Sequence, residues 1–232
     1  MTLFSILGVL IAVAGADVSK PTPIEGSQIL STTYKIEPGS ASEFLIQNTI
    51  ALEKLVAGID KAKGEDAKKK EAAIKSLVSG ILDLDVLGRR ALITYWDEVN
   101  KTANGKKLLS QYMATFKKLV EENYLEKARQ YVNGKYQIPL TGEEKTAKGS
   151  KITAKIKKTD VDLLVEFYVV KGDKGWRVVD IKLDDTSLEE TYRGSFNRII
   201  KKKGGIEAGL PELIAVMDKR LQELKKGKAT SI

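Results

Sequence analysis

The chain has 232 residues, of which 42% are hydrophobic and 30% are charged, a composition that indicates one globular domain with a sizeable core. It contains no cysteine and no histidine, which excludes disulfides, thiol chemistry and imidazole-based zinc sites. Catalysis would have to rest on Asp, Glu, Lys, Ser or Tyr side chains alone. The formal net charge of +8 favours anionic partners, and nucleic acid and anionic lipid both qualify.

The first residues differ in composition from the rest of the chain. Residues 3–14 form an uninterrupted run of apolar and small residues, and the small residues 14–16 that follow fit a cleavage pattern. We therefore expect residues 1–16 to be an export signal, although only the terminal amine carries positive charge before the run. A transmembrane helix is the alternative, but the run is shorter than the ~20 apolar residues needed to span a bilayer. The Pro/Gly/Ser-rich residues 17–39 predict an extended leader without regular elements.

Apolar residues then recur at helical spacing, which predicts amphipathic helices in the first half of the chain. The capping box of Ser40 and Glu43 marks the start of the first helix. The expected helices span residues 40–59, 65–82, 86–99 and 106–132.

The apolar period changes to two in the second half, which predicts strands over residues 151–157, 161–170 and 176–183. Residues 137–140 add a fourth strand, and Pro139 suggests that it lies at the edge of the sheet. Helices return after Ser187 and Glu190, which form a second capping box, and Pro211 is expected to open the last helix. This order predicts an α+β domain over residues 40–232, with helices packed on one face of an antiparallel sheet.

Most of the large aromatic residues fall on the faces that this pattern turns inward. They line either a solid core or an apolar cavity, and periodicity does not distinguish the two. The aromatic residues concerned are Tyr95, Trp96, Tyr112, Phe116, Tyr124, Phe167, Trp176, Tyr192 and Phe196.

Several blocks of this sequence resemble those of the MlaC, or toluene-tolerance, family. The resemblance extends over residues 81–224, and Ile93 departs from it by standing where the family commonly has glycine. It is carried by the segment from Asp83 to Leu92 with Tyr95-Trp96, by the aromatic spacing of Tyr112, Phe116 and Tyr124, by Gly175-Trp176-Arg177-Val178-Val179-Asp180-Ile181, and by Tyr192-Arg193 with Phe196-Asn197.

The resemblance implies an NTF2-like α+β fold with an apolar cavity that holds phospholipid acyl chains. It implies a soluble periplasmic carrier that shuttles lipid between the outer membrane and an inner-membrane ABC transporter. The implied partners are phospholipid as cargo, membrane-anchored components of the transporter and an outer-membrane lipoprotein complex. No nucleic acid, no cofactor, no metal and no catalytic residue are implied.

The inward faces of the expected elements supply the candidate lipid contacts. These are Leu92, Tyr95, Phe116, Leu119, Val165, Phe167, Val169, Val178, Leu188, Tyr192, Phe196 and Ile199. Lys201, Lys202 and Lys203 are the candidate partner-docking residues, with a solvated helix face as the plainer interpretation of this run.

The sequence is also compatible with three other functions. The chain could be an adaptor of an envelope ABC transporter that has a solid core and binds no lipid. It could be an enzyme that uses Asp83, Asp180 and Arg193, although the plainer interpretation is that Asp83 and Asp180 cap or brace element ends and that Arg193 makes a structural ion pair. A nucleic-acid protein is disfavoured because an exported chain rarely meets that target and no arginine-rich segment is present.

Overall fold

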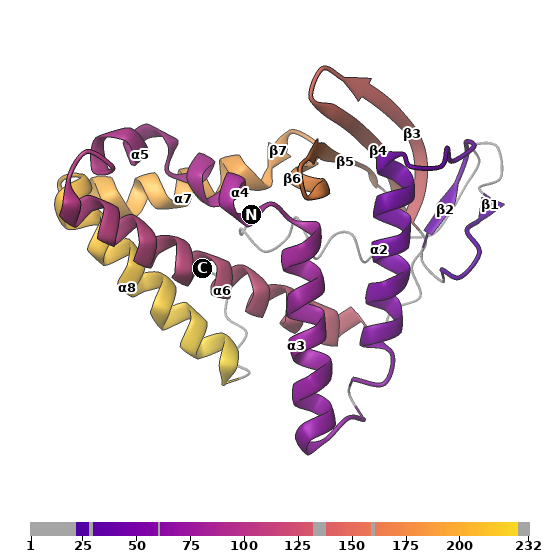
Figure 1. The fold of residues 1–232 in the computed structure, drawn as a ribbon, viewed down its shortest axis with the longest axis horizontal. Coiled ribbons are helices and arrows are strands. Elements are labelled where there is room, and N and C mark those ends of the chain that lie inside the picture. Colours follow the sequence, from indigo (N-terminus) through magenta and orange to yellow (C-terminus); the bar gives the residue numbers. More distant parts are fainter. Residues whose placement is uncertain (1–21, 28–29, 60, 132–137, 159–160, 227–232) are drawn as a thin grey trace.

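The structure is a computed structural model that describes residues 22–27, 30–59, 61–131, 138–158 and 161–226. The expected export signal at residues 1–16 lies outside the described residues. Within the described ranges the chain folds as α+β, which confirms the predicted class. Figure 1 shows α4 to α8 on the left and the sheet at the upper right, with α3 between them and α2 beside the sheet.

Helices make up most of the first half of the described chain and return at its end. The helices are α2 (Ala41–Val56), α3 (Gly64–Ile81), α4 (Leu84–Ala91), α5 (Ile93–Val99), α6 (Ala103–Tyr131), α7 (Leu188–Lys202) and α8 (Ile206–Lys225).

Two helix predictions were wrong in detail. The single helix expected over residues 86–99 is divided at Leu92, where ψ is 16° and the side chain turns into the core. The last helix begins at Ile206 rather than at Pro211, because Gly205 adopts a φ of 136° that lets the chain re-enter a helix early. Pro211 is exposed, so water can satisfy the Glu207 carbonyl that loses its helical partner.

The strands form one sheet in the order β1 to β7. Neighbouring strands are antiparallel except for β2 and β3, which run parallel. The strands are β1 (Thr22–Pro23), β2 (Leu30–Thr32), β3 (Ile138–Thr146), β4 (Gly149–Lys158), β5 (Val161–Gly172), β6 (Gly175–Leu183) and β7 (Thr186–Ser187).

The segment expected to be an extended leader supplies two of these strands, so the prediction that it contains no element was wrong. Leu30 and Ser31 of β2 are 5% and 1% exposed and pair with Ile138 and Pro139 of β3. Pro139 therefore does not lie at the edge of the sheet, because β2 covers it. The fold begins before Ser40.

One face of the central strands is apolar and buried. Val165 of β5 lies between Ala154 of β4 and Leu183 of β6. Two residues further along β5, Phe167 lies in the same way between Ile152 and Ile181. Helix α2 packs on β4, while α3, α4 and α7 pack on β6. Helices α6 and α8 pack against each other, and α6 also contacts α3 and α4. The buried residues form one continuous apolar cluster.

Candidate functional site

The sheet contributes one wall of the candidate site. Val165, Phe167 and Val169 alternate along β5 on its buried face, and Val178 of β6 pairs with Val169. Ile152, Ala154, Ile181 and Leu183 share this face and were missing from the predicted set. The signal that could have found Ile152 and Ala154 is the same period of two that predicted their strand.

The helices contribute an aromatic cluster, formed by Tyr112 and Phe116 of α6 with Tyr192 and Phe196 of α7. The ring centroids of Phe116 and Tyr192 lie 5.1 Å apart at 79°, and those of Tyr112 and Phe196 lie 5.9 Å apart at 88°. Such edge-to-face contacts between buried rings are favourable beyond the burial of area alone. The cluster therefore ties α6 to α7 without polar groups other than the two phenol hydroxyls.

Helix α4 reaches this cluster closely because it carries glycine at the crossing. A Cβ atom on Gly88 would lie 2.8 Å from the Cε and Sδ atoms of Met113 and 3.0 Å from a ring carbon of Phe116. The Tyr112 hydroxyl donates a hydrogen bond of 2.9 Å to the Gly88 carbonyl. A side chain at Gly88 would therefore displace the flexible end of Met113 and press on the Phe116 ring, so glycine suits this close crossing of α4 and α6.

The structure places every predicted lipid contact in or against the apolar cluster. Tyr95 and Ile199 are half-buried and pack against its margin. The others are buried, but they lie in two groups: the sheet wall and the aromatic cluster with its helical neighbours. The buried members are Leu92, Phe116, Leu119, Val165, Phe167, Val169, Val178, Leu188, Tyr192 and Phe196.

Three tyrosine hydroxyls lie within this apolar surrounding. Burial raises the pKa of Tyr112, Tyr124 and Tyr192 well above the usual range, and the neighbouring Tyr192 raises the pKa of the other two further. All three phenols therefore stay neutral at physiological pH and can donate hydrogen bonds.

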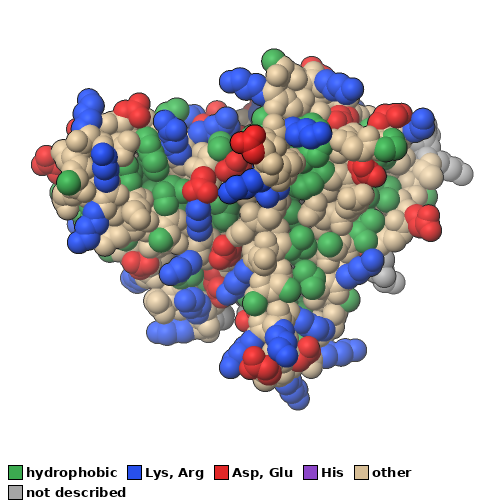
Figure 2. Space-filling view, in the orientation of Figure 1, with side chains coloured by type: hydrophobic (Ala, Val, Ile, Leu, Met, Phe, Trp, Pro, Cys, Tyr) green, Lys and Arg blue, Asp and Glu red, His purple; other side chains and the backbone are tan. Residues whose placement is uncertain are grey.

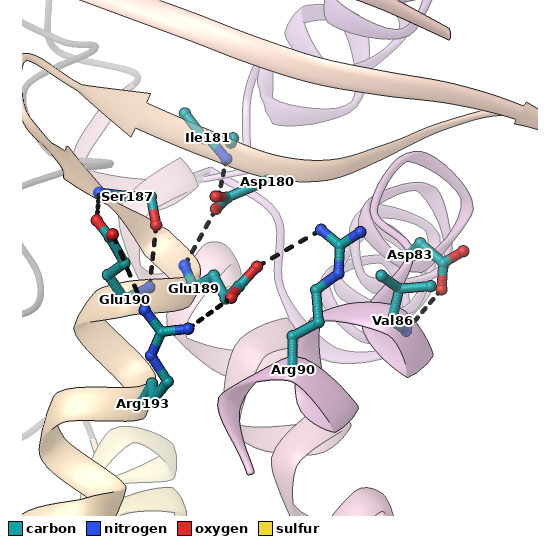
Figure 3. Close-up of polar contacts among 9 residues, drawn as sticks. All are labelled: Asp83, Val86, Arg90, Asp180, Ile181, Ser187, Glu189, Glu190 and Arg193. Carbon is teal, nitrogen blue, oxygen red and sulfur yellow. Dashed lines mark hydrogen bonds and ion pairs between the residues drawn. The ribbon is translucent and has the colours of Figure 1, made fainter. Parts of the chain in front are cut away.

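A group of hydrogen bonds connects β6 of the sheet to the first turn of α7 (Figure 3). Asp180 of β6 accepts hydrogen bonds from the backbone N–H groups of Ile181 and Glu189, at 2.9 and 3.0 Å. Burial raises the pKa of the Asp180 carboxyl, while these hydrogen bonds and the charge of Arg90 oppose the rise. Ser187 caps the same helix through the complete capping box that the sequence predicted.

The residues considered for an enzyme all have structural contacts. Asp83 caps α4 by accepting a hydrogen bond from the Val86 N–H at 2.9 Å, and its own N–H donates to the Val178 carbonyl. Arg193 forms ion pairs with Glu189 and Glu190, at 3.1 and 3.9 Å. With Asp180 bound to the start of α7, these contacts agree with the interpretation of all three residues as braces of the fold.

Neither metal-binding groups nor membrane-spanning helices are found in the described part of the chain. No cluster of three or more Asp and Glu side chains there could hold a metal ion. None of the described helices is both long and apolar enough to cross a bilayer.

The candidate docking lysines lie at the end of α7. Lys201, Lys202 and Lys203 are all exposed, and Lys203 also forms an ion pair of 3.2 Å with Glu212 of α8. On the face drawn in Figure 2, Lys and Arg side chains are interspersed with Asp and Glu rather than gathered into one basic stripe. Lys203 therefore has an exposed ion-pair partner on α8, whereas no ion pair is seen for Lys201 or Lys202 among the described residues.

Comparison with known proteins shows which fold this chain shares and then which family it belongs to. The fold matches the solved structure of the phospholipid-binding protein from Ralstonia solanacearum in complex with a phospholipid, with a TM-score of 0.57. The match covers 80% of this chain and 99% of that chain at 20% sequence identity, and it shows the shared α+β fold. The family model of the MlaC protein matches residues 51–219, so the chain belongs to the MlaC family. A comparison with curated proteins finds no match.

Proposed function

We propose that this protein is a periplasmic phospholipid carrier that holds acyl chains against its apolar core and exchanges lipid between the outer membrane and an inner-membrane ABC transporter. Membership of the MlaC family supports the proposal, as does the phospholipid bound to the Ralstonia solanacearum protein of the same fold. The observation that carries it is the continuous apolar cluster that joins the inner face of the sheet to the aromatic cluster.

The energetics explain why such a carrier needs an apolar interior. Each buried methylene contributes ~0.8 kcal/mol, so two acyl chains with about thirty methylenes together represent on the order of 20 kcal/mol. Free desorption of a phospholipid into water is therefore very slow. A protein interior of similar apolarity makes transfer nearly isoenergetic, and the membrane partners then decide the direction.

In this function the protein carries phospholipid as cargo, uses no cofactor and catalyses no reaction. Its protein partners are the membrane-anchored components of the transporter and an outer-membrane lipoprotein complex. The export signal expected at residues 1–16 and the domain that follows it fit delivery to the periplasm.

Native mass spectrometry tests the proposal directly. Protein purified without detergent is measured before and after incubation with phospholipid vesicles, and an organic extract of the same sample is analysed for lipid. We expect a protein peak shifted by the mass of a phospholipid, with mixed head groups in the extract, because recognition acts on the tails.

A bare polypeptide mass under both conditions would contradict the proposal. That result would favour an envelope adaptor, in which the aromatic cluster and the sheet wall form a solid core that admits no lipid.

A further inference from the structure

Tyr124 of α6 has a buried hydroxyl group that makes no hydrogen bond within the described chain. The hydroxyl is shielded from solvent, and among the residues that the structure describes it has no hydrogen-bond partner. Buried polar groups are nearly always hydrogen-bonded, so a native exception needs an explanation. The residue could have been phenylalanine without the loss of any hydrogen bond within the described chain.

The position of Tyr124 places it beside the candidate site. Phe116, Val120 and Tyr124 recur every four residues along α6 and so share one face of the helix. Phe116 belongs to the aromatic cluster, and Tyr192 of that cluster is close enough to Tyr124 to affect its pKa. The Tyr124 hydroxyl, which has no hydrogen-bond partner within the described chain, therefore lies near the aromatic cluster, on the side of α6 that faces α7.

Tyr112, on the same helix, provides the contrast. Its hydroxyl donates to the Gly88 carbonyl at 2.9 Å and so has a structural partner. Both phenols are buried and neutral, yet only one has its hydrogen bond provided by the fold. Because burial raises the pKa of Tyr124, its hydroxyl is a permanent donor that requires an acceptor.

A neutral carbonyl group suits this donor best. A phosphate oxygen would bring its charge into an apolar surrounding, where ionised groups are costly without paired cations. An acyl phospholipid carries ester carbonyl groups at the head of its tails, and these are uncharged and accept hydrogen bonds well.

We propose that the Tyr124 hydroxyl donates a hydrogen bond to an ester carbonyl oxygen of the bound lipid, and that this bond makes the protein prefer ester-linked over ether-linked tails. This inference rests on the proposed function and adds a determinant of specificity to it. The acyl chains would still supply most of the affinity, since a single net hydrogen bond changes a binding constant by about three- to tenfold.

Two phospholipids with the same head group and chain length test the inference, one with ester-linked tails and the other with ether-linked tails. Dissociation constants are measured for wild type, Tyr124→Phe and Tyr112→Phe. We expect wild type to bind the ester lipid about three- to tenfold more tightly than the ether lipid. Tyr124→Phe should abolish this preference by weakening ester binding alone, whereas Tyr112→Phe should retain the preference and lower the thermal stability.

The outcomes separate this inference from the proposed function. Failure of wild type to bind either lipid would remove the proposed function. Binding of both lipids by wild type without a preference, or a preference that survives Tyr124→Phe, would overturn the role of Tyr124 and leave lipid binding in place. Tyr124→Phe is expected to fold, because it removes a hydroxyl that has no hydrogen-bond partner within the described chain.

Discussion

Tyr112 and Tyr124 show how the same residue type on one helix can have two different roles. The hydroxyl of Tyr112 fastens α6 to α4 through the Gly88 carbonyl, whereas that of Tyr124 has no partner within the described chain. Their shared spacing predicted that both would be inward-facing. The difference between them depends on whether a backbone carbonyl from another helix lies within reach, and the sequence pattern of α6 contains no information about that.

Phe167 offers a residue-scale test of the sheet wall. It lies on the buried face of β5 between Ile152 and Ile181. In Phe167→Glu a carboxylate without a cation would face hydrocarbon, and an unpaired charge in such a place is costly. We expect the retained phospholipid, measured by native mass spectrometry, to fall about tenfold or more.

Val170→Glu is the matched control on the same strand. Val170 is half-buried on the opposite face of β5, where it pairs with Arg177, so its replacement should leave the lipid load unchanged. Circular dichroism establishes whether both variants fold. A folded Phe167→Glu protein with a full lipid load would show that this face of β5 does not contact lipid.

At the scale of elements, the features set by local periodicity and capping were predictable. The strands β4, β5 and β6 and the capping box of Ser187 appear where the sequence placed them. Strand β2 was missed because three residues carry too little periodicity, and its partner β3 lies more than a hundred residues away. The same missing partner explains why Pro139 was expected at an edge.

Another contact between distant segments holds the start of α2. Glu143 of β3 accepts hydrogen bonds from the N–H groups of Ala41 and Ser42, at 3.3 and 3.0 Å. Ser40 caps the next free N–H group of the turn, at Glu43. A carboxylate at this position satisfies helix-end donors and favours the positive end of the helix dipole.

The pKa of Glu143 gives this contact a measurable pH dependence. Burial on its own raises the pKa, but hydrogen bonds from the Ser42 and Ser150 side chains and from the two backbone N–H groups outweigh it, so the pKa is lowered. The folded-state value then lies below the unfolded value of about 4.3. The stabilisation is therefore complete above that pH and is lost as the pH falls through the folded-state pKa.

We predict that Glu143→Gln lowers the free energy of unfolding by about 0.5–1 kcal/mol at pH 7, because a neutral amide accepts these bonds less strongly than a carboxylate. The difference from wild type should disappear at a pH below the folded-state pKa. Urea unfolding at several pH values measures both effects. Glu144→Gln is the control, since Glu144 is exposed and pairs with Lys151 at the surface. A deficit for Glu143→Gln that is constant with pH would show that the charge of Glu143 does not stabilise α2.

At the scale of the whole molecule, the sequence predicted which faces turn inward but not how they are distributed around the interior. The residues expected to contact lipid lie on two structures, the sheet face and the aromatic cluster of α6 and α7 with its helical neighbours. Their arrangement depends on helix crossings such as the one at Gly88, where a side chain would displace the end of Met113 and press on Phe116. Periodicity within one element does not describe a crossing between two.

The net charge of +8 is also a property of the whole molecule, and it predicts how fast the carrier meets an anionic surface. Lys201 and Lys202 are exposed at the end of α7, whereas Lys203 pairs with Glu212, so reversal of Lys203 would also disturb the contact between α7 and α8. The sharper test is therefore the double variant Lys201→Glu with Lys202→Glu, compared with the same reversal at the exposed residues Lys68 and Lys69 of α3. Lys68 makes an ion pair of 3.7 Å with Glu65 of its own helix, but both side chains are so exposed that the pair contributes little.

We predict that the double reversal at Lys201 and Lys202 slows transfer of a fluorescent phospholipid to anionic vesicles several-fold, while the reversal at Lys68 and Lys69 has a smaller effect. Charges steer the encounter more than they strengthen the final complex, so association should slow while the lipid load stays unchanged. Screening acts over ~8 Å at physiological ionic strength, so added salt should slow transfer by wild type and reduce the difference between the proteins. Stopped-flow fluorescence at increasing salt measures these rates. Rates that do not depend on salt, or that fall equally for the two reversals, would show that Lys201 and Lys202 only solubilise the end of α7.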